Sequence, residues 1–213
     1  MKIPVLAHIS ALTYLIPVLA GTWQFKRLDY PMKIFFLLCV LSLIGVAIEY
    51  ILSIKHINNS FLINYYFLLD SLFLSVVYSY SIEDKRTKRI ILILTMLFIV
   101  SWVVDKLMFA VPHQMNSEMA VTSRVYIIVA STLMVLAIMK KTDSLLVDRP
   151  VFWVSTGYVL YSAGVVLIFG LSNELLKLGM LYFAVAWHIN WSLAIVANLM
   201  FTRSFFCKAK QQI

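Results

Sequence analysis

The stretch KIFFLLCVLSLIGVAIEYILSI, residues 33–54, decides the fold class of this chain. It contains only two charged residues, Lys33 at its start and Glu49 near its end. A helix of this length rises about 33 Å at 1.5 Å per residue, which matches a hydrocarbon core of about 30 Å. We therefore interpret residues 33–54 as a membrane-spanning helix.

Six more windows of similar length and composition lie on either side of this one. With it, the predicted spans are 4–23, 33–54, 61–81, 90–108, 120–139, 151–171 and 179–201. The composition of all 213 residues agrees, because 62% are hydrophobic and 13% are charged, against about 45–50% and about 25% in soluble proteins. Since the loops are short, neighbouring helices are predicted to be antiparallel. The chain is thus predicted to be an all-α integral membrane protein, a seven-transmembrane-helix bundle with residues 1–213 as a single domain.

The distribution of basic residues predicts the orientation of this bundle. Thirteen of the 18 Lys and Arg residues fall in the alternate loops and at the C-terminal end, on one predicted side of the membrane. Cytoplasmic loops collect Lys and Arg, so we expect the N-terminus outside, the C-terminus in the cytoplasm and a location in the cell inner (cytoplasmic) membrane. The net charge of +8 then reports topology and attraction to anionic membrane lipid, and no nucleic-acid partner is expected.

A few polar side chains fall within the predicted spans, where an ionisable group is costly unless it is paired or faces a wet cavity. Helical spacing turns several of them towards a common interior, with aromatic side chains beside them. The residues that we expect to line an outward-facing pocket are Glu49, Asp70, Asp105, Arg124, His188, Tyr66, Tyr161 and Trp191.

Three interpretations of these residues remain open from the sequence. In the first, they are interhelical struts, in which Asp70 bonds to His188 and Arg124 pairs with Asp105 or Glu49. In the second, they recognise the polar group of a small molecule or lipid. In the third, they form the site of an intramembrane lipid-modifying enzyme, with Asp70 or Glu49 as general base and His188 as acid or orienting group.

Motifs for metal or cofactor chemistry are absent from the sequence. The four His residues lie in four separate segments, and no HxxxH or HExxH pattern occurs. We therefore expect no metal and no cofactor. A retinal protein is excluded because residues 179–201 contain no Lys for a Schiff base.

Small residues in the window 151–171 recur every seven positions. Ser155 and Ser162, Thr156 and Ala163, and Gly157 and Gly164 each lie seven residues apart. Such a face allows the backbones of two helices to approach closely. We interpret it as a packing surface with no chemical role.

Three longer stretches carry a resemblance to a group of membrane proteins. They are NNSFLINYYFLLDSLFLSVVYS (58–79), RPVFWVSTGYVLYSAGVVLIFG (149–170) and WHINWSLAIVANLMFTRSFFC (187–207). Together they resemble small bacterial seven-transmembrane-helix proteins of unassigned function, which are similar to the membrane sensor module of some histidine kinases. The matching polar anchors are Glu49, Asp70, the Pro–x–Phe–Trp sequence at 150–153 and the pair Trp187–His188.

The resemblance implies a sensor-like module. Only about a dozen residues follow the last span, so we expect signalling through a separate cytoplasmic protein partner. The predicted function is that of a receptor-like or sensor-like membrane protein, with an intramembrane enzyme and a structural or accessory membrane subunit as alternatives. With several small-residue faces available, a homodimer is as compatible with the sequence as a monomer.

Overall fold

The structure of the chain is a computed structural model, and it describes residues 4–55, 57, 60–108, 117–141 and 145–207. These residues form helices and short connections only. The helices are α1 (Val5–Thr13), α2 (Leu15–Gln24), η1 (Phe25–Arg27), α3 (Tyr30–Ile54), α4 (Ser60–Ser81), α5 (Lys85–Met108), α6 (Ser117–Lys141), η2 (Leu146–Asp148), α7 (Pro150–Gly170), α8 (Ser172–Leu178) and α9 (Met180–Phe205). The predicted all-helical fold is confirmed.

Six segments within the described residues are long and apolar enough to cross a membrane. They are Val5–Arg27, Tyr30–Ile54, Lys85–Met108, Ser117–Lys140, Pro150–Gly170 and Met180–Phe205. The chain is therefore a multi-pass membrane protein by helix length and hydropathy. The remaining long helix, α4, has 22 residues and packs among them against α3, α5 and α6. Its role as a seventh span stays a prediction.

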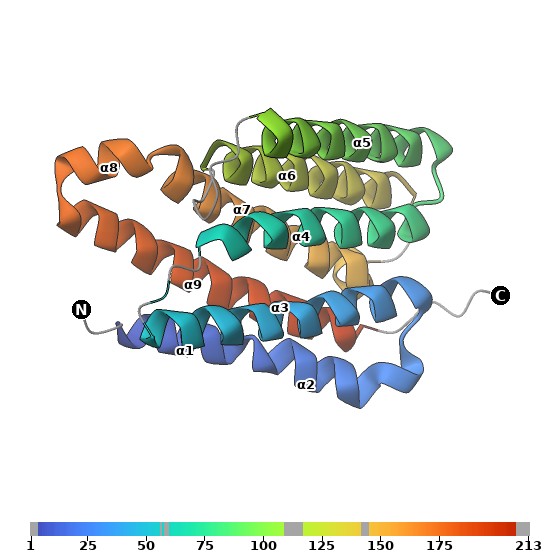
Figure 1. Ribbon diagram of the computed structural model, residues 1–213. Coiled ribbons are helices and arrows are strands. Elements are labelled where there is room, and N and C mark those ends of the chain that lie inside the picture. The colour runs from blue at the N-terminus through green and yellow to red at the C-terminus, as the bar shows by residue number, and fades with distance from the viewer. Residues whose placement is uncertain (1–3, 56, 58–59, 109–116, 142–144, 208–213) are drawn as a thin grey trace.

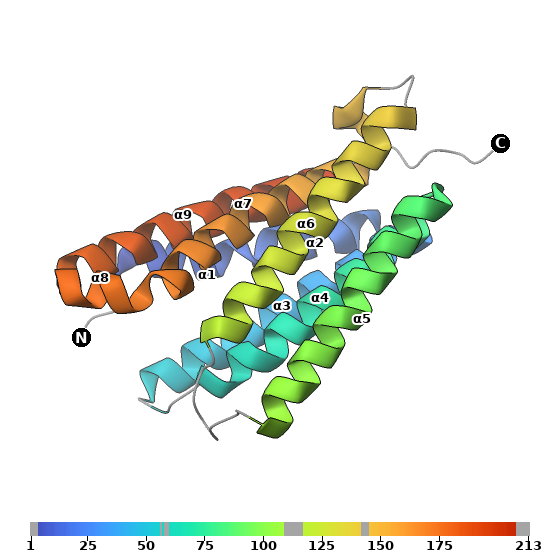
Figure 2. The same ribbon diagram turned by 90° about the horizontal axis from the view of Figure 1, so that it is seen from above.

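The long helices run roughly along one direction (Figure 1). In the view from above, α3, α4 and α5 follow one another on one side, α7 and α9 lie on the other, and α6 passes between them (Figure 2). The N- and C-terminal ends lie at opposite ends of the bundle in Figure 1. This arrangement follows from an odd number of long helices joined by short turns.

Two helices, α3 and α5, begin earlier than the hydropathy windows predicted, and an acidic residue caps each of them. The Asp84 carboxylate accepts hydrogen bonds from the backbone N–H groups of Arg86 and Thr87 at 3.2 and 3.0 Å. The helix α5 therefore begins at Lys85, five residues before the predicted span, and includes the charged turn. Asp29 caps α3 in the same way through the Met32 N–H, at 3.1 Å.

The first span is interrupted at Tyr14, where α1 ends and α2 begins. Pro17 is buried in the first turn of α2. A proline has no N–H to donate to the carbonyl four residues earlier, so the regular helix breaks at this point. The Thr13 hydroxyl donates to the Ser10 carbonyl at 2.6 Å and accepts from Asn198 Nδ2 of α9 at 2.9 Å.

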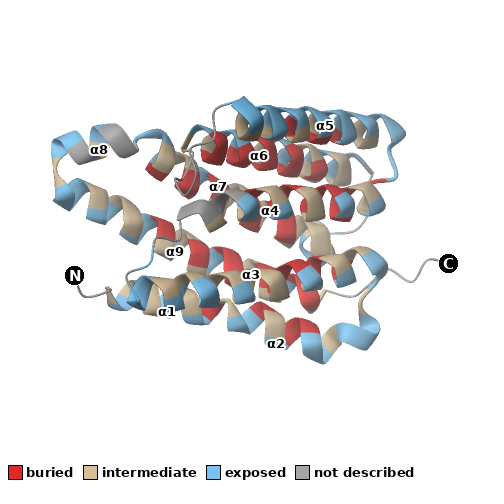
Figure 3. Cartoon of the chain, in the orientation of Figure 1, coloured by how far each residue is buried: buried red, intermediate tan, exposed pale blue. Residues whose placement is uncertain are grey.

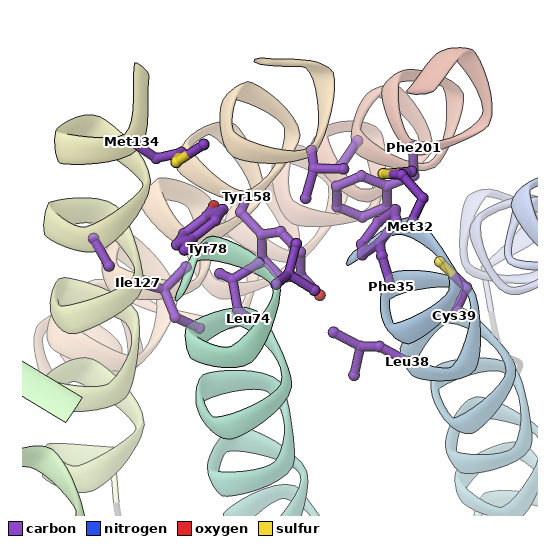
Figure 4. Close-up of a cluster of buried hydrophobic side chains, with 14 of the residues drawn as sticks. Met32, Phe35, Leu38, Cys39, Leu74, Tyr78, Ile127, Met134, Tyr158 and Phe201 are labelled. Atoms are coloured by element: carbon purple, nitrogen blue, oxygen red, sulfur yellow. The ribbon is translucent and has the colours of Figure 1, made fainter. Parts of the chain in front are cut away.

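Burial concentrates on the inward faces of α4, α6, α7 and α9, while α5 and the described residues of α8 are largely exposed (Figure 3). Figure 4 shows the centre of the apolar core, to which α3, α4, α6, α7 and α9 all contribute. Its labelled members are Met32, Phe35, Leu38, Cys39, Leu74, Tyr78, Ile127, Met134, Tyr158 and Phe201. The core thus holds both halves of the bundle together.

Candidate functional site

A buried ion pair joins α4 and α6 in the interior of the bundle. Arg124 Nη1 lies 2.8 Å from Asp70 Oδ2, and the two side chains are 1% and 5% exposed. Asp70 is the eleventh of the 22 residues of α4 and Arg124 the eighth of the 25 residues of α6. Both charges are therefore well removed from the ends of their helices.

Aromatic rings from α4 and α7 surround the guanidinium group. The Arg124 Cζ atom lies 4.2 Å from the ring centroid of Phe67 and 5.5 Å from that of Tyr161. A guanidinium over an aromatic face is stabilised by the ring quadrupole, most strongly where water is excluded. The Tyr158 hydroxyl donates to Asp70 Oδ1 at 3.4 Å, so α7 contacts both members of the pair.

Two further polar side chains, from α3 and α4, belong to the same region by their position. Tyr66 lies one helical turn before Asp70 on α4, and Glu49 lies one turn after Gly45 on α3. The Tyr66 ring lies against Gly45 of α3 so closely that a Cβ at Gly45 would stand 2.2 Å from the ring edge. Glycine at this position is therefore what allows the ring to approach α3. We call Glu49, Tyr66, Asp70, Arg124 and Tyr161 the interior polar cluster.

Three atoms of the interior polar cluster are buried without a hydrogen bond among the described residues. They are Arg124 Nε, the Tyr66 hydroxyl oxygen and Arg124 Nη1, which contacts Asp70 only as an ion pair. A buried polar group that lacks a partner costs about 1–3 kcal/mol, and more when it is charged. Five of the eight residues predicted for the pocket thus come together in the structure, and this cluster retains unused hydrogen-bonding capacity.

The predicted pairing of Asp70 with His188 is wrong. His188 is exposed on α9, where it bonds to the Ala184 carbonyl at 2.7 Å and contacts the Trp191 ring edge-on at 5.2 Å. The carbonyl four residues earlier satisfies one ring nitrogen, so the side chain needs no partner from another helix to be held in place. Matching depth along two helices did not determine which faces meet.

Arg124 pairs with Asp70, and the predicted partners Asp105 and Glu49 are wrong. The helix α6 begins at Ser117, three residues before the predicted span, so Arg124 lies two turns inside the helix. Asp105 is half-buried towards the end of α5. The ammonium of its neighbour Lys106 lies 5.6 Å from the Trp102 ring centroid and 5.9 Å from that of Tyr65.

An open depression marks the outer surface of α9. Val185, His188, Ile189, Ser192 and Leu193 line it. These residues include one member of the predicted pocket, His188, and none of the interior polar cluster. The candidate residues thus divide between an internal group and an external one.

A ladder of hydroxyl groups between α4 and α6 was missed by the sequence analysis. Tyr78 and Ser131 hydroxyls lie 2.7 Å apart, and Thr95 of α5 bonds to both Ser75 and the Tyr126 hydroxyl, at 3.0 and 2.9 Å. Ser71, Ser75 and Tyr78 share one face of α4 by their spacing. The sequence signal for their partners is the series Ser123, Tyr126 and Ser131 on α6, which the sequence analysis did not use. The ladder fixes the register of α4, α5 and α6 around the ion pair.

The two environments of α9 lead to a stability prediction. His188→Ala is expected to change the free energy of unfolding by no more than about 0.5 kcal/mol, because the side chain is exposed and bonded within its own helix. Asn198→Ala is expected to cost about 1–3 kcal/mol, because it removes the donor to the buried Thr13 hydroxyl oxygen, which keeps only its bond to the Ser10 carbonyl. Unfolding in detergent micelles, followed by circular dichroism, measures both. Equal losses in the two variants would show that His188 has a buried partner.

Comparison of the chain with protein families, with curated proteins and with solved structures found no match.

Proposed function

We propose that this protein is a receptor-like or sensor-like protein of the cytoplasmic membrane of a bacterium, in which the interior polar cluster recognises a small molecule or lipid. In this proposal α4 is the seventh span, the N-terminus is outside and the C-terminus is cytoplasmic. The opposite positions of the termini support the topology, as do the thirteen basic residues assigned to the cytoplasmic side.

The observation that carries the proposal is the position of the Asp70–Arg124 pair. It is buried in the interior of an apolar bundle, Tyr158 and Tyr161 connect it to α7, and Arg124 Nε has no partner among the described residues. Charged groups inside a membrane are costly and usually mark a functional site. A ligand with a polar group that replaces part of this network changes contacts on three helices at once.

Signalling then follows from a shift between two packings of the bundle. A ligand can favour one packing only by the difference between its affinities for the two states. Since α6 and α7 are joined by the segment 142–149, a change in their relative position reaches the predicted cytoplasmic surface directly. A separate cytoplasmic protein partner would read the change there.

The intramembrane enzyme has less support than the receptor. It needs an acid and His188 in one site, and the structure places Asp70 inside the bundle and His188 on its surface. No specific observation on the described residues favours a homodimer or an accessory subunit.

The proposal predicts a bound species that depends on Asp70. Native mass spectrometry of the protein released from lipid nanodiscs is expected to show a small molecule or lipid on the wild type that is lost in Asp70→Asn. Adding that species back is expected to raise the thermal midpoint of the wild type by mass action and to leave Asp70→Asn unchanged. The matched control is Glu174→Gln, which removes a carboxylate from an exposed pair and is expected to keep the species.

Two outcomes oppose the proposal. If wild type, Asp70→Asn and Glu174→Gln carry the same bound molecules, the interior polar cluster is not the binding site. If the wild type carries none and a panel of lipids and metabolites does not shift its midpoint, the cluster holds helices together, and the protein is an accessory subunit.

A further inference from the structure

The formal charge of the chain is concentrated at the end of the bundle where α2, α4, α6 and α9 finish. In the sequence, thirteen of the 18 basic residues and five of the ten acidic ones fall in the segments 26–33, 83–89, 140–149 and 203–210. These segments therefore carry the whole formal charge of +8, and the rest of the sequence is neutral. A positive end of this kind is attracted to an anionic surface over about one Debye length.

Half of this charge gathers over the neighbouring ends of α3, α4 and α5. Lys26, Arg27 and Lys33 lie around the start of α3, and the sequence KRTKR, 85–89, opens α5. Only three acidic residues accompany these seven basic ones. Two of the three, Asp29 and Asp84, are hydrogen-bonded to backbone N–H groups as helix caps. The net charge of this surface is therefore +4.

Two exposed tyrosines connect the two groups of basic residues. The Tyr30 and Tyr80 rings meet edge-on with centroids 4.8 Å apart, although the residues lie on α3 and α4. They are 58% and 61% exposed. The Lys88 ammonium lies 6.0 Å from the Tyr80 ring centroid, so α5 joins the same surface. We call Tyr30, Tyr80, Lys33 and residues 85–89 the basic tyrosine surface.

The chemistry of this surface matches the interfacial layer of a bilayer. Tyrosine rings at the ends of membrane spans sit at headgroup level, where the ring is in contact with lipid and the hydroxyl with water. Clusters of Lys and Arg immediately beyond a span bind anionic lipid headgroups. Here the tyrosines and the basic residues lie on the same three helix ends, and Tyr80 contacts both Tyr30 and Lys88. Several cations are therefore within reach of one layer of phosphate groups.

We propose that the basic tyrosine surface is a binding site for anionic phospholipid headgroups of the leaflet on this side of the membrane. The site takes a phosphodiester with no compensating positive charge, such as phosphatidylglycerol, in preference to a zwitterionic headgroup. It is independent of the interior polar cluster, which lies in the bundle core.

The test compares lipid enrichment in the wild type and three variants. Each is reconstituted in nanodiscs with equal amounts of phosphatidylglycerol and phosphatidylcholine, and the lipids retained after transfer to detergent are counted by native mass spectrometry. The wild type is expected to retain phosphatidylglycerol over phosphatidylcholine by at least about fivefold, the factor that one Lys or Arg near an anionic surface contributes. Arg86→Gln/Lys88→Gln/Arg89→Gln is expected to lose most of this preference.

The matched control removes the same number of charges elsewhere. Lys55→Gln/Lys106→Gln/Lys177→Gln neutralises three lysines away from this end and is expected to keep the wild-type preference. Arg86→Lys/Arg89→Lys keeps the charge and is expected to keep it as well, which separates lost charge from lost folding. Retention of both lipids at their bulk ratio by the wild type would overturn the proposal, and so would an equal loss in both triple variants.

Discussion

Replacing Arg124 by methionine is expected to lower the free energy of unfolding by about 3–5 kcal/mol, the usual cost of removing one partner from a buried ion pair. The variant leaves the Asp70 carboxylate, which is 5% exposed, without the cation that lies 2.8 Å away. It also removes the guanidinium from the Phe67 and Tyr161 rings. Reversible unfolding in detergent micelles by a denaturing surfactant measures the change.

A second variant separates the lost pair from lost packing. In Asp70→Asn/Arg124→Met the uncompensated charge is gone, so a large part of the stability is expected to return. The matched control is Lys177→Met, which breaks the 2.7 Å pair with Glu174 on the surface, where the side chains are 70% and 65% exposed. That change is expected to stay within about 1 kcal/mol. Equal losses for Arg124→Met and Lys177→Met would show that Asp70 is solvated.

The helices were predictable because the membrane restricts the possible answers. A segment that spans the hydrocarbon core must satisfy its backbone internally, so a long apolar window with charged ends implies a helix. The predicted windows agree with the observed helices to within five residues, and the differences at the starts of α3 and α5 arise at ends capped by Asp29 and Asp84. The predicted span that began at residue 90 was too short, because Asp84 caps α5 and the helix therefore includes the charged turn 85–89. The short helix α8 was missed because its seven residues have no span-length pattern.

The contacts between helices were harder to predict than the helices themselves. Hydropathy gives the depth of Asp70, Arg124 and His188 but does not fix the rotation of each helix about its axis. In a bundle that is apolar on all sides, the sequence carries little signal for this rotation. His188 faced away because its own helix offered the Ala184 carbonyl. Asp70 pairs instead with Arg124 of α6.

The seven-residue repeat on α7 was the exception, since it did predict an inter-helix contact. Ser155, Gly157, Ser162 and Gly164 are all buried, and α7 packs against both α6 and α9. The third pair of the repeat departs from this face, because Thr156 is half-buried and Ala163 is exposed. A Cβ on Gly164 would stand 2.6 Å from Leu193 Cδ1 of α9. Small side chains are informative because lipid itself is as apolar as leucine, so close packing is the main gain when helices associate. The small-residue packing face was therefore predictable from the sequence, whereas the polar contacts between helices were not.

Gly157→Leu is expected to destabilise the protein by about 3 kcal/mol, the upper part of the range for overpacking a core. A Cβ on Gly157 would lie 2.6 Å from Phe201 Cε1 and 3.4 Å from Met200 Cβ. The Phe201 ring has little room to move, because it packs against Phe35 and Tyr158 with centroids 5.3 and 4.9 Å away. Thermal unfolding in nanodiscs, followed by tryptophan fluorescence, measures the loss.

The same helix provides the control for this prediction. Gly170 is exposed at the end of α7, and a Cβ there would meet only Val121 Cγ2, at 3.8 Å. Gly170→Leu adds the same side chain without a clash, and its change is expected to stay within about 1 kcal/mol, with helix propensity slightly in its favour. A loss in Gly157→Leu as small as that in Gly170→Leu would mean that α7 and α9 separate easily. The two helices would then be a moving interface of the bundle instead of its fixed core.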